Sequence, residues 1–188
     1  MDTGRRENRR AALLAAARDD LLNAGAAGVT LARVGSATGL ARSSVYEYFG
    51  SSGDLLAEVA VLAFGEWAAD VRAAVDDAEP GWPQLQAYVS RTLMMVSEGR
   101  HDIAAALDKV DFTAAQREKF RGLHIDLTEP LLRSLVFLDV PCPETHAALI
   151  QGMIDGATRQ ISRGADALQL SAITCELILN GLSTIRVP

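Results

Sequence analysis

Several features that define common protein classes are scarce in this chain of 188 residues. Cysteine occurs only at Cys142 and Cys175, which are far apart and lack metal-ligand spacing, so we expect reduced thiols rather than a disulfide. No apolar run reaches the roughly 18 residues of a membrane span, and no apolar signal core follows the basic start MDTGRRENRR. These absences predict a cytoplasmic protein that is neither exported nor anchored in a membrane.

Signatures of common enzyme classes are also missing from the sequence. It has no HExxH motif, no phosphate-binding glycine loop and no nucleophile elbow. His101, His124 and His146 follow no regular metal-ligand spacing, and Asp155 and Arg159 are better interpreted as a pair on a helix surface or interface. We therefore expect no enzymatic activity, no cofactor and no bound metal.

The composition and the charge distribution indicate a helical protein with two dissimilar parts. Hydrophobic residues make up 49% of the chain, and valine and isoleucine show no period-two alternation, which favours an all-α fold. Residues 1–50 carry seven arginines and five acidic residues, whereas residues 51–188 carry eleven basic and nineteen acidic residues. A basic N-terminal part on an acidic body is typical of a DNA-binding domain joined to a regulatory domain, although ordinary scatter in charge would give the same excess.

The most informative stretch is residues 31–49, LARVGSATGLARSSVYEYF. Its pattern predicts two short helices around Gly39, where a tight turn needs a positive φ. Leu31 and Val34 lie on the inward side of the first helix, and Val45 and Phe49, four residues apart, point inward from the second. This spacing predicts a helix-turn-helix, whose second helix enters the DNA major groove.

Further positions complete a pattern that runs from about Ala11 to Leu56. They are Ala16, Ala17, Gly25, Thr30, Gly39, Tyr46, Phe49, Ser51 and Leu55. With these residues the chain resembles the TetR family of bacterial transcriptional repressors. The resemblance implies an all-α fold of about nine helices, with a three-helix helix-turn-helix DNA-binding domain in residues 1–52 and a helical ligand-binding and dimerisation domain in residues 53–188.

The chain departs from the family pattern in three places. Ala41 replaces the usual Ser or Thr cap of the recognition helix, and such a loss costs about 1 kcal/mol. Ser52 and Gly53 replace a Lys-Glu pair, which removes one expected phosphate contact. Val34 and Gly35 replace an Ile-Ala pair, and we expect this change only to thin the core.

We expect base reading from Arg42, Ser43 and Ser44, because arginine can bind guanine through two hydrogen bonds and serine can bind several base edges. We expect Tyr46 and Tyr48 to bind backbone phosphates. The family resemblance implies a further phosphate contact from Thr30, at the start of a helix. The predicted DNA-binding residues are Thr30, Arg42, Ser43, Ser44, Tyr46, Tyr48 and Ser51.

The basic N-terminus has two open interpretations. We expect residues 1–8 to be disordered and a helix to run from about Asn8 to Asn23. The four arginines of this arm either reach phosphates or a minor groove, or form a solvated tail. They are Arg5, Arg6, Arg9 and Arg10.

Beyond the helix-turn-helix, apolar residues recur at helical spacing to the end of the chain. The predicted helices are Gly53–Asp77, Trp82–Glu98, Ile103–Asp108, Thr113–Leu138 (with a kink at Pro130), Glu144–Ser162 and Asp166–Thr184. Aromatic and methionine side chains on them line either a ligand pocket or an ordinary core, and His124 is the expected polar anchor of a neutral or weakly polar ligand. The predicted pocket residues are Phe64, Trp67, Tyr88, Met94, Met95, Phe112, Phe120 and His124.

The last two predicted helices are apolar on more than one side, so a monomer would expose part of that surface. The family resemblance implies that they pair with the same helices of a second copy in a four-helix bundle; a packed monomeric core is the alternative. The predicted interface residues are Leu149, Gly152, Met153, Gly156, Arg159, Leu177, Ile178 and Gly181.

Together these features predict a ligand-responsive transcriptional regulator, most simply a repressor, that is associated with the nucleoid through DNA. A homodimer would bind a palindromic double-stranded operator and be released by a small, largely apolar effector. Two alternatives remain open: a helical protein-interaction protein whose DNA-binding domain is degenerate, and a regulator that senses oxidants through Cys142 or Cys175.

Overall fold

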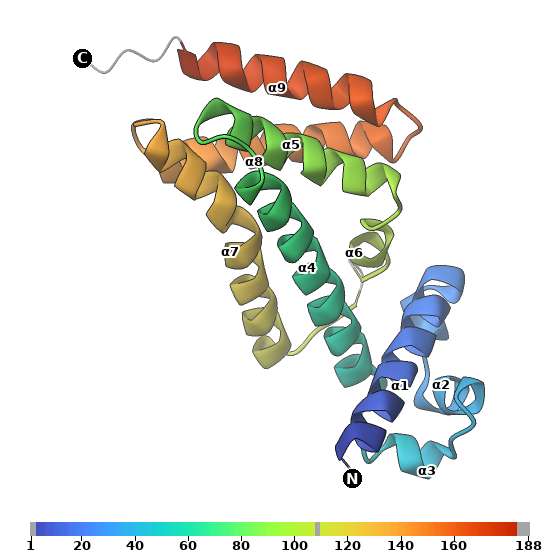
Figure 1. The fold of residues 1–188 in the computed structure, drawn as a ribbon. Coiled ribbons are helices and arrows are strands. Elements are labelled where there is room, and N and C mark those ends of the chain that lie inside the picture. Colours follow the sequence, from blue (N-terminus) through green and yellow to red (C-terminus); the bar gives the residue numbers. More distant parts are fainter. Residues whose placement is uncertain (1–2, 108–109, 184–188) are drawn as a thin grey trace. The chain divides into compact units, whose positions relative to one another are not determined.

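The computed structural model describes residues 3–107 and 110–183, and within these ranges the chain forms α-helices and one short 3₁₀ helix without any strand (Figure 1). This architecture confirms the predicted all-α fold. None of the described helices has the length and apolarity needed to cross a membrane. The elements are α1 (Thr3–Ala24), η1 (Ala26–Gly28), α2 (Leu31–Ala37), α3 (Arg42–Val45), α4 (Ser52–Asp76), α5 (Trp82–Ser97), α6 (Asp102–Leu107), α7 (Ala114–Phe137), α8 (Pro143–Ile161) and α9 (Ala167–Ser183).

The chain divides into two compact units. The N-terminal unit comprises Met1–Phe64 and Asp102–Arg121, and the C-terminal unit comprises Gly65–His101 and Gly122–Pro188. Helices α4 and α7 therefore contribute residues to both units. The functional boundary at residue 53 stays a prediction, because compactness alone does not define which residues contact DNA.

Helix α1 begins earlier than the sequence predicts. Disorder is predicted for residues 1–8, but the helix starts at Thr3, and residues 1–2 lie outside the described residues. Two long-range contacts explain the difference, because the guanidinium groups of Arg6 and Arg10 lie over the rings of Tyr48 and Phe49. Such contacts stabilise the first turns of the helix but leave no trace in local helix propensity.

The helix-turn-helix forms as predicted, and each of its boundaries has a local cause. Thr30 caps α2, since its hydroxyl accepts a hydrogen bond from the backbone N–H of Arg33 at 3.2 Å. Gly39 has φ 69°, which permits the reversal between α2 and α3. Gly35 does more than thin the core: a Cβ there would lie 2.8 Å from the carbonyl oxygen of Leu40, so only glycine permits this close approach.

A single hydrophobic core holds the N-terminal unit together. Leucines from α1 meet residues from α2, α3, α4 and α6, so the core fixes the helix-turn-helix to α1 and to the start of α4. An exposed face of the unit adds an ion pair between Arg33 and Asp20 at 2.8 Å. The fully buried side chains include Leu13, Leu21, Val34, Val45, Phe49, Leu55 and Ile103.

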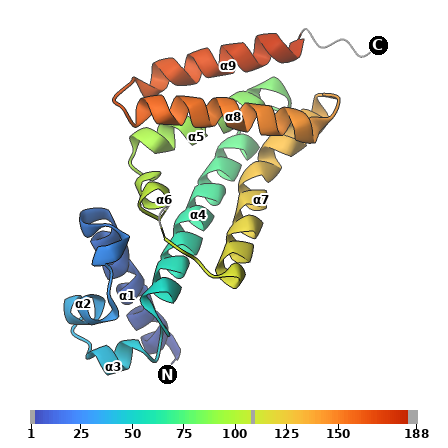
Figure 2. The same cartoon turned by 180° about the vertical axis from the view of Figure 1, so that it is seen from behind.

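In the C-terminal unit, α5, α8 and α9 lie side by side (Figure 2). Their shared core also includes Val71 and Val75 from α4 and Leu131 and Leu135 from α7. Ser134 is fully buried and donates its hydroxyl hydrogen to the carbonyl of Pro130 at 2.9 Å, which satisfies that group without water. The core thus encloses one side of α8 and α9 and leaves other sides uncovered.

The turn into α8 stores backbone strain that a substitution should release. Cys142 has φ 48° and ψ 58°, a left-handed conformation that costs a residue with a Cβ about 1–2 kcal/mol. We expect Cys142→Gly to raise the free energy of unfolding by about 0.5–1 kcal/mol after the greater chain entropy of glycine is subtracted. Urea denaturation would measure this as a higher midpoint with an unchanged slope. Cys142→Ala keeps the strain and serves as the control; equal midpoints for the two variants would contradict the assignment.

Candidate nucleic-acid interface

The recognition helix is short and presents a polar outer face. Helix α3 spans Arg42–Val45 and continues as a turn to Tyr48. Val45 and Phe49 are 0% and 2% exposed, so they are the residues that attach this segment to the core. Arg42, Ser43 and Tyr46 are exposed, and Ser44 is half-buried. The N-cap, Ala41, provides no side-chain hydrogen bond, as its apolar side chain predicts.

Arg42 and Tyr46 form one exposed pair on this face. The Arg42 guanidinium donates to the Tyr46 hydroxyl at 2.9 Å and lies 5.5 Å from the centre of its ring. The two residues are four apart, so they lie on the same side of the helix. This contact holds the arginine near the protein surface while leaving donor hydrogens of its guanidinium free for a base or a phosphate.

A surface hollow of about 480 Å³ lies next to this pair. Its lining contains several donors of the kind that bind phosphate oxygens, from three separate parts of the sequence. The N-terminus of α4, a helix of 25 residues, adds a positive dipole end at the same place. The polar lining residues are Thr30, Arg42, Tyr46, Ser51 and Ser52.

Side-chain hydrogen bonds fix the N-terminus of α4 and connect it to the start of α7. Ser51 accepts from the backbone N–H of Asp54 at 3.0 Å and donates its hydroxyl to the Asp54 carboxylate at 2.8 Å. At the start of α7, Thr113 and Gln116 form a capping box, in which each side chain accepts a hydrogen bond from the backbone N–H of the other residue. The Gln116 side chain then donates to the other Asp54 oxygen at 3.0 Å, so one hydrogen bond joins the two helix starts.

Tyr48 and the N-terminal arginines form the other flank of the interface. Tyr48 is half-buried against the core, and the Arg6 guanidinium lies 5.8 Å from its ring centre. Arg10 lies 5.4 Å from the ring centre of Phe49 and forms an ion pair with Glu58. The sequence indicated the basic arm but not these contacts, because they join residues about 40 positions apart.

The predicted pocket residues divide between the cores of the two units. In the N-terminal unit, Phe64 packs against the core and the rings of Phe112 and Phe120 meet edge to face, 4.7 Å apart. Trp67, Tyr88, Met94 and Met95 belong to the core of the C-terminal unit. The side chain of His124 lies outside the described residues.

Tyr88 is the best-defined polar group among these candidates. It is 2% exposed, and its hydroxyl accepts a hydrogen bond from Gln151. Burial raises the pKa of Tyr88 to about 12, with a smaller contribution in the same direction from the charge of Asp155. The hydroxyl therefore stays neutral at physiological pH and can act only as a hydrogen-bonding group.

Most of the predicted interface residues lie on uncovered faces of α8 and α9. Leu149 is 64% exposed and Leu177 is 59% exposed, while Gly152 and Gly181 face open space in the chain described. Ile178 differs from its neighbours because it is only 4% exposed and belongs to the core of its own chain. Of the remaining predicted positions, Met153 and Gly156 are half-buried and Arg159 is exposed.

The environment of Cys175 disfavours thiol sensing at this residue. The side chain is 5% exposed and its sulfur lies 3.7 Å from the Ser90 hydroxyl oxygen. Burial raises the pKa of the Cys175 thiol, so the reactive thiolate is rarer at pH 7–8 than for an ordinary cysteine. Within the described ranges, no cluster of three or more His, Cys, Asp or Glu side chains could hold a metal ion.

We expect the two thiols to react at very different rates in the folded protein. In a thiol titration at pH 8, exposed Cys142 should react at once, and buried Cys175 should react more than roughly 100-fold more slowly. The reaction rate of Cys175 should rise when the pH exceeds the raised pKa of its thiol, or when denaturant is added. Rapid reaction of a Cys142→Ser variant in native buffer would show that Cys175 is accessible after all.

A comparison with protein families finds a match in this part of the chain. Residues 13–59 match the family model described as bacterial regulatory proteins, tetR family. This segment is therefore similar to the N-terminal domain of TetR-family regulators. The matched TetR domain contains the exposed residues Thr30, Arg42 and Tyr46 as well as the joined start of α4.

Solved structures extend the TetR likeness to the whole fold. A TetR/AcrR-family regulator from Thermobifida fusca YX-ER1 has a TM-score of 0.77 at 16% identity, over 95% of this chain and 100% of that chain. The fatty acid degradation regulator FadR from Bacillus halodurans has a TM-score of 0.76 at 18% identity, over 93% of this chain and 96% of that chain. FadR from Bacillus subtilis, solved in complex with stearoyl-CoA, has a TM-score of 0.74 at 17% identity, over 93% of this chain and 98% of that chain. Comparison with curated protein sequences finds no match.

At these identities the structural likeness establishes the TetR fold and no individual activity. The structure also shows which functional residues the sequence interpretation missed. Gln116 was not singled out, although Thr113-x-x-Gln116 is a readable capping-box pattern.

Proposed function

We propose that this TetR-family regulator is a repressor that binds a palindromic operator as a homodimer and is released by a small, largely apolar effector. The observation that carries the proposal is the exposed Arg42–Tyr46 pair beside a hollow lined by hydroxyl groups and by the N-terminus of α4. A guanidinium suits a guanine edge, and the hollow suits a backbone phosphate.

The homodimer is supported by the uncovered faces of α8 and α9. Leu149, Leu177 and Ile173 are 64%, 59% and 45% exposed, which is unfavourable for a monomer in water. Among the described residues, none lies within 4 Å of a Cβ added at Gly152, so a second backbone could approach closely there. Because one α3 reads only a few base pairs, two symmetric copies would read half-sites roughly 34–36 Å apart, or a multiple of that distance.

An apolar effector is supported by the kind of side chains that the candidates contribute. Flexible methionines and aromatic rings form adaptable binding surfaces, and Met94 and Trp67 are only partly buried by the core of their own unit. The Bacillus subtilis FadR structure holds stearoyl-CoA, so a molecule with a long acyl chain is the first effector class to test.

Regulation then follows from linkage between the two binding events. An effector that prefers a shape unsuited to the operator must lower DNA affinity by the same factor by which DNA lowers effector affinity. The hydrogen bond from Gln116 to Asp54 offers one route, since it ties the start of α7 directly to the start of α4. A movement of α7 would thereby reposition Ser51 at the edge of the phosphate hollow.

Footprinting on the DNA around its own gene would test the proposal most directly. We expect one protected palindrome, with binding that weakens as salt rises and as an acyl-chain compound is added. The absence of any sequence-specific protection would overturn the proposal and would favour the alternative of a helical protein-interaction module. Protection that no apolar compound affects would retain the operator but exclude this effector class.

A further inference from the structure

The first two turns of α1 form a strongly basic helix end. Four arginines lie within residues 5–10, and the one acidic residue among them is Glu7. Because successive residues in a helix are about 100° apart, Arg5 and Arg9 share one face, while Arg6 and Arg10 share an adjacent face. The two pairs therefore meet different surroundings.

Arg6 and Arg10 serve as anchors. Their guanidinium groups lie 5.8 Å from the ring centre of Tyr48 and 5.4 Å from that of Phe49, and Arg10 also pairs with Glu58. Tyr48 and Phe49 follow directly after α3, so these contacts hold the first turns of α1 beside the recognition segment. The basic helix end is thus ordered before any DNA arrives, which lowers the entropy cost of using it.

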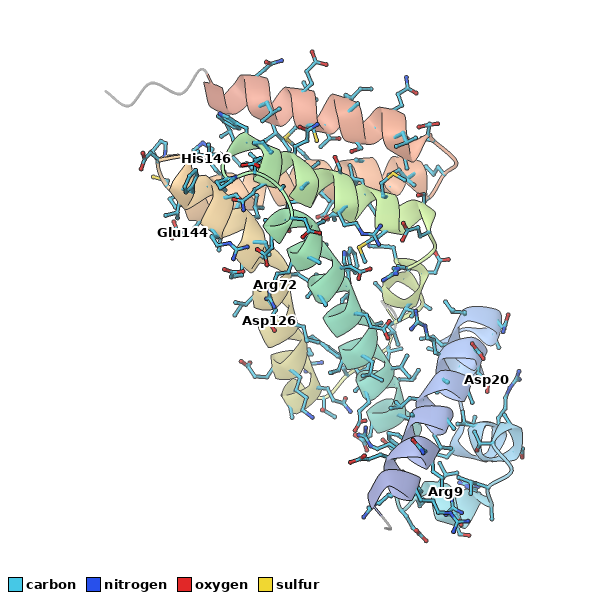
Figure 3. All side chains as sticks on the ribbon, in the orientation of Figure 1. Arg9, Asp20, Arg72, Asp126, Glu144 and His146 are labelled. Atoms are coloured by element: carbon cyan, nitrogen blue, oxygen red, sulfur yellow. The ribbon has the colours of Figure 1, made fainter. Side chains whose placement is uncertain are left out.

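Arg5 and Arg9 have no such task. Both side chains are exposed, and within the part of the chain that the structure describes they make neither an ion pair nor a hydrogen bond. Figure 3 shows Arg9 at the end of α1 that lies near α3. Two exposed guanidinium groups on an anchored helix, at the border of the proposed DNA-reading surface, have the charge and the hydrogen-bond donors that bind backbone phosphates.

We propose that Arg5 and Arg9 bind backbone phosphates of the double-stranded operator just outside the base pairs that α3 reads. This inference rests on the proposed function, since it extends the same DNA-binding surface to a third helix. It makes α1 a phosphate-contacting element whose outer arginines bind DNA and whose inner arginines fix its position.

The helical start of α1 also decides between the two uses of a basic arm. An α-helix with its side chains is about 10–12 Å across, whereas the minor groove of B-DNA is about 6 Å wide. A helix that begins at Thr3 therefore cannot itself lie in the minor groove as an extended strand would, which favours contacts to phosphates over an inserted arm. Phosphates on the groove edges are the groups within reach of its arginines.

The test compares full-length wild type with Arg5→Ala/Arg9→Ala on a labelled operator duplex over a range of salt concentrations. Each lost phosphate contact should reduce the slope of log K against log salt by about 0.9, so the double variant should lose about 1.8. Its affinity should fall by the same factor for the operator and for a scrambled duplex. A duplex trimmed to the palindrome should bind both proteins equally, because the flanking phosphates are gone.

Two further variants make the result specific. Arg72→Ala/Arg163→Ala removes two exposed arginines from the C-terminal unit and should leave the slope unchanged. Arg5→Lys/Arg9→Lys keeps the charges and should retain most of the slope. Circular dichroism should show the same helix content for all variants, since the altered side chains are exposed.

The outcomes separate this inference from the proposed function. If Arg5→Ala/Arg9→Ala keeps the wild-type slope while the wild type still protects a palindrome, α1 is not a DNA contact and the repressor proposal stands. If the wild type binds no operator, both proposals fail together. A loss confined to the operator and absent for scrambled DNA would mean base reading, which also overturns the phosphate assignment.

Discussion

Replacing Leu149 and Leu177 by glutamate is expected to break the proposed homodimer into monomers and to abolish operator binding at nanomolar concentrations. The two leucines are 64% and 59% exposed in the single chain. In a twofold interface each leucine occurs once on each subunit, so four leucine side chains would become buried. Burying one leucine contributes about 1.5–3 kcal/mol. Losing these contacts and introducing like charges should weaken dimerisation at least roughly a thousandfold. Sedimentation velocity at micromolar concentration would measure the change.

Ile125→Glu provides the matched control. Ile125 is 60% exposed on α7, outside the proposed interface, so the same change of charge there should leave both sedimentation and operator binding intact. If the wild type itself sediments as a monomer, or if the double glutamate variant stays dimeric, the terminal helices do not form the interface. Thermal unfolding of each variant would confirm that the exposed positions tolerate glutamate without loss of the fold.

The helix-turn-helix could be predicted almost residue by residue because its causes are local. The Thr30 cap, the positive φ of Gly39 and the inward pair of Val45 and Phe49 each follow from residues a few positions apart. The role of Gly35 could not be predicted in the same way. Its lack of a Cβ matters only because the carbonyl of Leu40 returns to it after the turn.

Contacts between distant segments explain most of what the sequence did not predict. Helical spacing shows that Phe120 and Tyr88 face inward, but it does not show that they pack in the cores of different units. Likewise, α9 is apolar on more than one side, and this pattern does not show that Ile178 packs in the core of its own chain. Arg6 stabilises the start of α1 only because Tyr48 lies beside it in the fold.

The second large effect is expected at the recognition helix itself. Arg42→Ala should weaken binding to the operator by about 1–3 kcal/mol and should relax specificity at one base pair of each half-site. The reason is geometric: Arg42 lies at the start of α3, is exposed, and is held by the Tyr46 hydroxyl at 2.9 Å. Equilibrium binding to the operator and to its single-base variants, at one fixed salt concentration, would measure both effects.

Tyr46→Phe separates the support of Arg42 from the contact that Arg42 makes with DNA. It removes the hydroxyl that accepts from Arg42 but keeps the ring, whose centre is 5.5 Å from the guanidinium. We expect Tyr46→Phe to lose less DNA affinity than Arg42→Ala. The loss should be equal for all operator variants, because the Tyr46 hydroxyl is expected to contact a phosphate and such a contact carries no sequence information. If Arg42→Ala also weakens all sequences evenly, Arg42 binds phosphate in the hollow and base reading passes to Ser43 and Ser44. If it changes nothing at fixed salt, α3 is not the reading element.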